Sequence, residues 1–137
     1  MPLSATPQVT ASLTLNSPNL LNDALSLSVT SKLYKAGTSE SLAETSGLAR
    51  TAYGAVTDEP FYAAADYTAS PMAAKLYVKN TSTVNTDYVE ITIGSTNVVI
   101  GRLYGGDFAF IPWMGTEDLD ITTSAALTIE SMLIHES

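Results

Sequence analysis

Residues 88–93 read YVEITI, and their alternation of apolar and polar side chains decides the fold class. Val89, Ile91 and Ile93 fall on one side of an extended chain, because successive side chains of a strand point to opposite faces. The residues GSTN at 94–97 then supply turn chemistry before the next apolar segment. This pattern is typical of a short antiparallel strand with one buried face.

The same period of two extends outward from this stretch in both directions. Further strands are predicted at residues 9–15, 25–33, 75–79, 98–104, 108–111, 119–121 and 127–134, with a less regular one at 48–56. Residues 36–47 have a loop-like composition, TDEP at 57–60 closes the irregular strand, and the Ala-rich segment 61–70 has room for one short helical turn. No longer helix is expected. The chain is therefore predicted to be all-β, a jelly-roll-like antiparallel β-sandwich of about eight or nine short strands.

Length and composition favour one ordered domain. The chain has 137 residues, of which 45% are hydrophobic and 15% charged, unlike a disordered chain. We expect a single β-sandwich domain over residues 1–137, with residues 1–8 as an N-terminal arm. Ser and Thr together number 33, so much of the polar surface consists of hydroxyl groups.

The charge balance argues against several classes of partner. Fourteen acidic residues against six basic ones give a net charge of −8, which is a poor basis for displacing the counterions of a nucleic acid. Residues 1–57 are balanced, and residues 58–137 account for the whole net charge. This asymmetry indicates either two differently exposed faces or chance clustering in a small protein.

No targeting or membrane-spanning signal is recognisable. The N-terminal residues MPLS contain neither a basic nor an apolar region of a secretory signal, and no apolar run approaches the length of a membrane helix. We therefore expect synthesis in a cytoplasm, and no membrane partner. Asn80-Thr81-Ser82 matches a glycosylation sequon, but in this setting it is interpreted as a polar turn.

Catalytic and metal-binding patterns are weak. The chain has no cysteine, and its one histidine, His135, lies two residues from the C-terminus. The acidic residues Glu117, Asp118 and Asp120 lack the spacing of a calcium loop, and a solvated turn is the preferred interpretation. Trp113 is interpreted as a core residue rather than a partner-facing anchor. We expect no enzymatic activity, no cofactor, no metal and no small-molecule substrate.

The second half of the chain also contains an informative succession of segments. It runs from KLYVKNTS at 75–82 through YVEI at 88–91 to IGRLYGGDFAFIPW at 100–113, and closes at 127–136. This succession resembles small virion proteins of tailed bacteriophages. TSGLA at 45–49 and the Ser/Thr alternation of the first half resemble them more loosely.

The resemblance implies a structural role in a virion. The expected function is that of a capsid decoration (cement) protein, which binds the outer surface of the head and stabilises it. A component of the tail, baseplate or fibre attachment is the first alternative, and a carbohydrate- or protein-binding β-sandwich module is the second. The expected partner is the major capsid protein or another virion protein, and the expected location is the virion, assembled in the host cytoplasm.

Two further expectations concern interfaces. We expect a homo-oligomer, most simply a trimer, because few charges are present to shield sheet edges. The uncharged first part of the chain is the candidate docking surface, since burying it avoids the cost of desolvating charges. The candidate interface residues are Leu3, Val9, Leu13, Leu15, Leu20 and Leu21.

Overall fold

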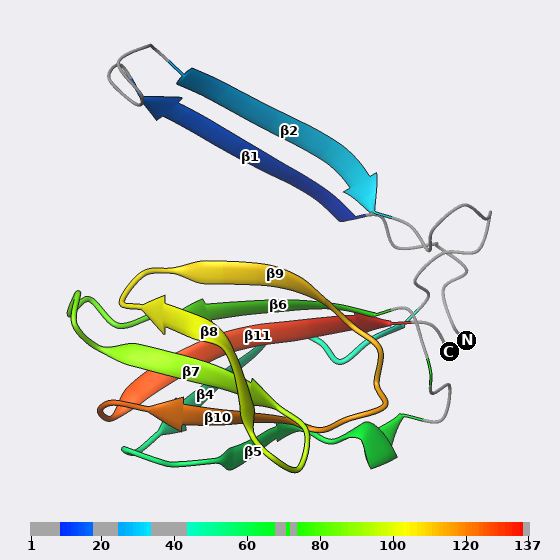
Figure 1. Ribbon diagram of the computed structural model, residues 1–137, viewed down its shortest axis with the longest axis vertical. Helices are drawn as coiled ribbons and strands as arrows, with labels where there is room; N and C mark the ends of the chain where they lie inside the picture. The colour runs from blue at the N-terminus through cyan, green and yellow to red at the C-terminus, as the bar shows by residue number, and fades with distance from the viewer. Residues whose placement is uncertain (1–8, 18–24, 34–43, 68–70, 72–73, 136–137) are drawn as a thin grey trace. The chain divides into compact units, whose positions relative to one another are not determined.

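The computed structural model of the chain describes residues 9–17, 25–33, 44–67, 71 and 74–135 (Figure 1). Contacts within the chain divide it into two compact units, with the division between Leu42 and Ala43. The expected single domain over residues 1–137 stays a prediction. The expected arm at residues 1–8 lies outside the described residues.

The first unit contains two paired strands, β1 (Val9–Ser17) and β2 (Leu25–Leu33). They run antiparallel, in a register that places Leu13 opposite Val29 and Leu15 opposite Leu27. Residues directly opposite each other belong to the same face of an antiparallel ribbon, so the apolar positions of the two strands share one face. The alternation in the sequence predicted both strands, and the structure confirms them.

The second unit contains nine strands in its described part, and they form two antiparallel sheets. Their bounds are β3 (Glu44–Thr45), β4 (Ala49–Tyr53), β5 (Glu59–Tyr62), β6 (Ala74–Asn80), β7 (Tyr88–Ile93), β8 (Val98–Tyr104), β9 (Phe108–Trp113), β10 (Leu119–Thr123) and β11 (Leu127–His135). One sheet has the order β5-β10-β7-β8. The other has the order β11-β6-β9, and both β3 and β4 pair with the free side of β11.

The order of the strands is that of a jelly roll. From β4 to β11 the chain changes sheet at every connection except the one between β7 and β8 (Figure 1). The two resulting four-stranded orders, β4-β11-β6-β9 and β5-β10-β7-β8, pair strands that are far apart in the sequence. The predicted all-β antiparallel sandwich is therefore confirmed.

The core lies between the two sheets. Alternate residues of the central strands are buried, as in β6, where Leu76 and Val78 are fully buried and their neighbours only partly so. The strands β7, β10 and β11 repeat this pattern, and Trp113 closes the cluster at the end of β9. The period of two in the sequence thus corresponds to the inward face of each central strand.

Between the irregular strand and β6, one feature of the chain agrees with expectation and another differs from it. The short helical turn is present as a 3₁₀ turn at Ala64–Asp66, as predicted. However, β5 (Glu59–Tyr62) forms where the sequence predicted only the end of a strand and the start of the helical turn. Pro60 misled that prediction. A proline cannot donate to a ladder, but β5 is an edge strand with one side unpaired, and there a proline is tolerated.

Asn80 joins the two sheets. Its side chain is fully buried, and its Nδ2 donates to the backbone oxygens of Asp87 (3.2 Å) and Leu103 (3.0 Å). Its Oδ1 accepts a hydrogen bond from Ser82 N at 3.0 Å. Leu103 belongs to β8 and Asn80 to β6, so one side chain links the end of each sheet. The amide is fully engaged, in agreement with the interpretation of Asn80-Thr81-Ser82 as a turn.

Candidate functional site

The outer face of the β4-β11-β6-β9 sheet carries a row of alternating charges. The register places Arg50 of β4 opposite Glu130 of β11, and Glu130 opposite Lys79 of β6. Lys75 lies on the same face of β6, since both lysines alternate with buried residues. The fourth cation of residues 43–137 is Arg102 on β8, so three of the four cations share this outer face.

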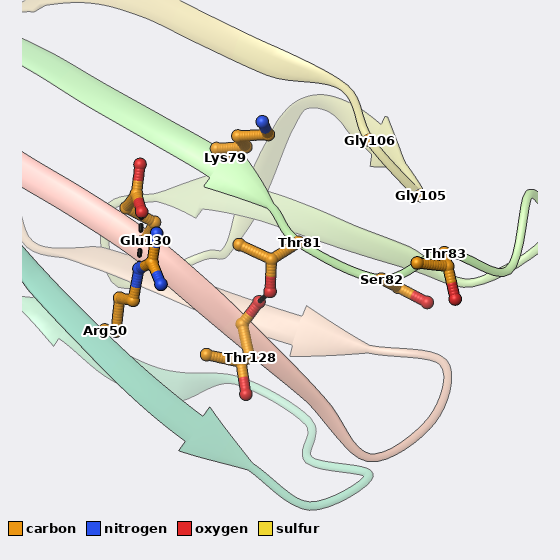
Figure 2. Close-up of a pocket in the computed structure, with 9 residues that line it drawn as sticks. All are labelled: Arg50, Lys79, Thr81, Ser82, Thr83, Gly105, Gly106, Thr128 and Glu130. Atoms are coloured by element: carbon orange, nitrogen blue, oxygen red, sulfur yellow. Dashed lines mark hydrogen bonds and ion pairs between the residues drawn. The ribbon is translucent and has the colours of Figure 1, made fainter.

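A groove of about 690 Å³ opens over Arg50, Glu130 and Lys79 (Figure 2). Side chains of β4, β6 and β11 form its floor, with Arg50, Lys79 and Glu130 among them. Its wall consists of Thr81–Thr83, from the loop between β6 and β7, and of Gly105–Gly106, from the turn between β8 and β9. The lining is polar, and its formal charge is +1 in a protein whose net charge is −8.

Glu130 is the one carboxylate of the groove, and both of its oxygens are occupied. Arg50 Nε donates to Oε2 at 2.6 Å, and the hydroxyl of Tyr77 donates to Oε1 at 2.8 Å. These two bonds, that of Tyr77 first, lower the pKa of Glu130 below its ordinary value because they favour the ionised carboxylate. Burial and the bond to Glu130 raise the pKa of Tyr77. The carboxylate therefore remains charged and holds the Arg50 guanidinium in place.

The cations of the groove keep donors that no neighbour uses. Within the described residues, the Lys79 ammonium has no hydrogen bond or ion pair, although its charge helps to lower the pKa of Glu130. Arg50 uses only Nε, and its side chain is 71% exposed. Figure 2 shows the Lys79 side chain extending away from the Arg50–Glu130 pair. The groove thus offers free donors, while each oxygen of its carboxylate already accepts one hydrogen bond.

Close packing holds the loop wall of the groove in place. Thr81 Oγ1 donates to Thr128 O at 2.7 Å, and Ser82 Oγ donates to Asp87 Oδ2 at 2.7 Å. A Cβ atom at position 105 would overlap the carbonyl oxygen of Val84, so only glycine allows the turn to pack against this loop. The wall is consequently preformed.

The free side of β8 is a second surface of interest. Val98, Val99 and Ile100 are 59%, 51% and 49% exposed, and β8 is the last strand of its sheet. Among the described residues, positions 98–101 make no hydrogen bond outside their pairing with β7. Arg102, the charged residue of this strand, bonds to Glu90 at 3.1 Å and lies over the Tyr88 ring at 4.1 Å, both on β7. We call residues 98–101 the β8 edge.

The β5-β10-β7-β8 sheet has acidic residues on and near β10. Burial, and next the charges of Asp118 and Asp58, raise the pKa of Asp120 on β10. Asp118 also has a structural role, because its Oδ1 accepts a hydrogen bond from Ala64 N at 2.7 Å at the 3₁₀ turn. In the described ranges, no group of three or more His, Asp or Glu side chains is placed to hold a metal ion.

The interface residues predicted from the sequence fall in the first unit or outside the described residues. Leu3, Leu20 and Leu21 lie outside them. Val9, Leu13 and Leu15 belong to β1, where the register assigns them to one face of the ribbon. Their role in docking stays a prediction.

Two single residues considered from the sequence have clear positions. Trp113 is 5% exposed, packs edge-on against Tyr67, and donates from Nε1 to Glu117 O at 3.0 Å. Its interpretation as a core residue is confirmed. His135 ends β11, with its ring 5.0 Å from that of Tyr67.

Sequence reasoning missed the groove. Arg50 and Glu130 are 80 positions apart, and the loop and turn that complete the wall come from two further parts of the chain. The only usable signal was the alternation of Lys75 and Lys79 with buried residues, which places both lysines on one outer face.

Comparison with known proteins offers no relative from which to transfer a function. No protein-family model, no curated protein and no solved structure matches the chain. Within the part of the chain that the structure describes, none of the helical segments has the length and apolar character needed to cross a membrane.

Proposed function

We propose that this chain is a structural protein of a bacteriophage virion, most simply a decoration protein that binds the outer surface of the capsid. The observation that carries the proposal is the β8 edge, a run of three exposed apolar residues on the last strand of its sheet, with a bulge at Ile100 that leaves this residue without a partner on β7. The succession of segments that resembles small virion proteins agrees with it. The major capsid protein is the proposed partner.

The β8 edge has the properties of a docking strand. Sheet edges in monomeric proteins are usually protected by charges, prolines or covering segments, because free backbone groups recruit other strands. Here the exposed apolar residues are Val98, Val99 and Ile100. The side chain of Arg102, the cation of β8, is directed to Glu90 and Tyr88 on β7. A partner strand added to this edge gains backbone hydrogen bonds as well as apolar burial.

The proposed homo-oligomer uses other sheet edges, since the β8 edge can pair with only one neighbour. A small sandwich has two open sides, and a closed ring of three copies covers one edge of each copy. Joint contacts with the capsid and with sister copies would then reach the order of 1,000 Å² of buried surface that a stable interface needs. The acidic sheet is left to face solvent, where like charges keep particles apart. The proposal includes no enzymatic activity, cofactor or nucleic-acid partner.

The test begins with a mass-spectrometric inventory of virions of the phage that encodes the chain. The protein is expected in purified virions, and in the head fraction when heads and tails are separated. Its presence in the tail fraction alone would favour the tail, baseplate or fibre role over the decoration role. Its absence from virions would overturn the proposal and leave a host-encoded binding module as the better interpretation.

A pair of variants then tests the β8 edge. The double change Val98→Lys and Ile100→Lys places two charges on exposed positions, so the fold should survive while occupancy on virions falls at least tenfold. The control is Leu48→Lys, because Leu48 is 63% exposed but precedes β4, a strand of the other sheet. Equal occupancy of the edge variant and the control, with both folded by circular dichroism, would contradict docking through β8.

A further inference from the structure

We propose that the groove between Arg50, Lys79 and the β6–β7 loop binds an acidic saccharide, one whose sugar rings carry carboxylate groups. This proposal does not depend on a place in a virion, since it rests on the donors and acceptors of the groove alone. It assigns a ligand class to a surface that the decoration role leaves unused.

The balance of donors and acceptors selects an anion. The Glu130 carboxylate already accepts from Arg50 and Tyr77, so it offers little to a ligand. The ammonium of Lys79 and the terminal nitrogens of Arg50 remain free among the described residues. Charge-assisted hydrogen bonds to a carboxylate are stronger than neutral ones, so these donors favour an anionic ligand over a neutral one.

The spacing of the two cations suits a chain of sugar rings better than a single small anion. Arg50 and Lys79 lie on β4 and β6, with β11 between them. The two backbones are two strand separations apart, about 10 Å, and Glu130, already bonded to Arg50, lies between the two cations. A ligand with charged groups along its length can reach them together. The open groove of about 690 Å³ gives such a chain room to lie along the sheet.

The surroundings of Lys79 favour a saccharide over an acidic peptide. Phe108 pairs with Lys79 across β6 and β9, and it is 66% exposed, the largest exposed fraction among the exposed large apolar residues. An uncovered aromatic ring beside a cation is a platform for the C–H face of a sugar ring. The hydroxyl groups of Thr83 and Thr128 can both donate to and accept from sugar hydroxyls.

The central strands of the groove offer an acidic peptide few backbone contacts. The strands β6 and β11, which contribute Lys79 and Glu130, are paired on both sides within their sheet. They therefore have no free backbone edge for an extended peptide, and β4, which contributes Arg50, offers one only on its side away from β11. An acidic peptide is accordingly the comparison ligand of the test.

The experiment is a ¹H–¹⁵N NMR titration of the full chain with hexagalacturonate, which reports both affinity and location. We expect saturable shifts in the backbone signals of Thr81, Gly105 and Gly106. Maltohexaose, which is neutral, and hexaglutamate, which is an acidic peptide, should each bind at least tenfold more weakly. Affinity for hexagalacturonate should fall as salt rises from about 20 to about 300 mM, because the cations are exposed to solvent.

Matched variants locate the site. Lys79→Gln should weaken hexagalacturonate binding by about tenfold, the effect of losing one charge-assisted contact. Lys75→Gln removes the same charge from the same face of the same strand, outside the groove, and should change affinity less than twofold. Phe108→Ser should also weaken binding of the saccharide, while leaving any binding of hexaglutamate unchanged.

Three results would overturn the proposal. The first is the absence of saturable shifts with hexagalacturonate at millimolar concentration. The second is an equal loss of affinity in Lys79→Gln and Lys75→Gln, which would reveal only general charge attraction. The third is hexaglutamate binding as tightly as hexagalacturonate, which would assign the groove to acidic proteins.

Discussion

Glu130 and Asp120 occupy outward positions on the two sheets of the sandwich, yet their surroundings differ in sign. Glu130 on β11 lies beside Arg50 and Lys79, accepts two side-chain hydrogen bonds, and has a lowered pKa. Asp120 on β10 lies near Asp118 and Asp58, and burial together with these charges raises its pKa. The inward faces of the same strands are alike, with alternate buried aliphatic residues.

This contrast separates two kinds of constraint on a β-sandwich. The inward positions must fill a shared core, so both sheets use the same apolar residue types. The outward positions are not required for packing, so their charges can differ with a smaller effect on the fold. The difference between the outer faces therefore points to their partners: a donor-rich groove on one sheet, and an acidic, solvated surface on the other.

The largest expected effect comes from breaking the link between the two sheets. Asn80→Ala removes three side-chain hydrogen bonds and leaves the carbonyl oxygens of Asp87 and Leu103 without this donor. At about 1 kcal/mol per bond, the free energy of unfolding should fall by about 3 kcal/mol. Urea denaturation measures it. Asn85→Ala, an exposed change in the following loop, is the control and should have little effect. A loss from Asn80→Ala below about 1 kcal/mol would show that Asn80 contributes little to joining the sheets.

An intermediate effect is expected from the carboxylate of the basic face. Glu130→Gln should lower the free energy of unfolding at neutral pH, by less than Asn80→Ala, because the amide is a weaker acceptor for Arg50 and Tyr77. Because the pKa of Glu130 is lowered, its ionised form stabilises the fold at pH values above the ordinary pKa of 4.5. This contribution is lost as the pH falls through the folded-state pKa. Urea titrations from about pH 7 to about pH 2.5 should therefore show the wild-type advantage shrinking. An advantage that stays constant with pH would mean that the charge of Glu130 is irrelevant.

The smallest effect, of opposite sign, is expected on the acidic sheet. Asp120→Asn should raise the free energy of unfolding at neutral pH by about 0.5 kcal/mol or less, since it removes the burial of a charged carboxylate and its repulsion by Asp118 and Asp58. A raised pKa means that ionisation of Asp120 disfavours the folded state above its ordinary value of 3.8, and that this penalty disappears at lower pH. The measurement is thermal unfolding of the wild type and of Asp120→Asn, from neutral pH to below the ordinary pKa of 3.8. A destabilised Asp120→Asn at neutral pH would contradict the repulsion.

The strands were the most predictable part of this molecule. Central strands such as β7 and β11 have one buried and one exposed face, and this difference appears directly as a period of two in the sequence. The prediction missed the edge strand β5, because its four residues include Pro60 and show no clear alternation. An edge strand is held by its neighbour rather than by its own pattern, so local sequence carries a weak signal of it.

The candidate sites were less predictable than the fold. Individual charges such as Lys79 and Glu130 were visible in the sequence, but their proximity was not, because it depends on the pairing of β6 with β11. The β8 edge was visible as an apolar segment, and only the strand order reveals that one side of it is unpaired. A docking surface predicted on the first part of the chain rested on the lack of charge, which does not specify a partner.

The sequence by itself determined the all-β class, most of the strands and the residues that face the core, because these follow from local alternation between apolar and polar side chains. Only the tertiary structure decided which strands are neighbours, which strand is left at an edge, and which charges gather on one face. Arg50, Lys79 and Glu130 meet because the chain crosses between the sheets and brings β4, β11 and β6 side by side. That juxtaposition depends on how non-local strand pairs close a common core, and no short segment of the chain contains it.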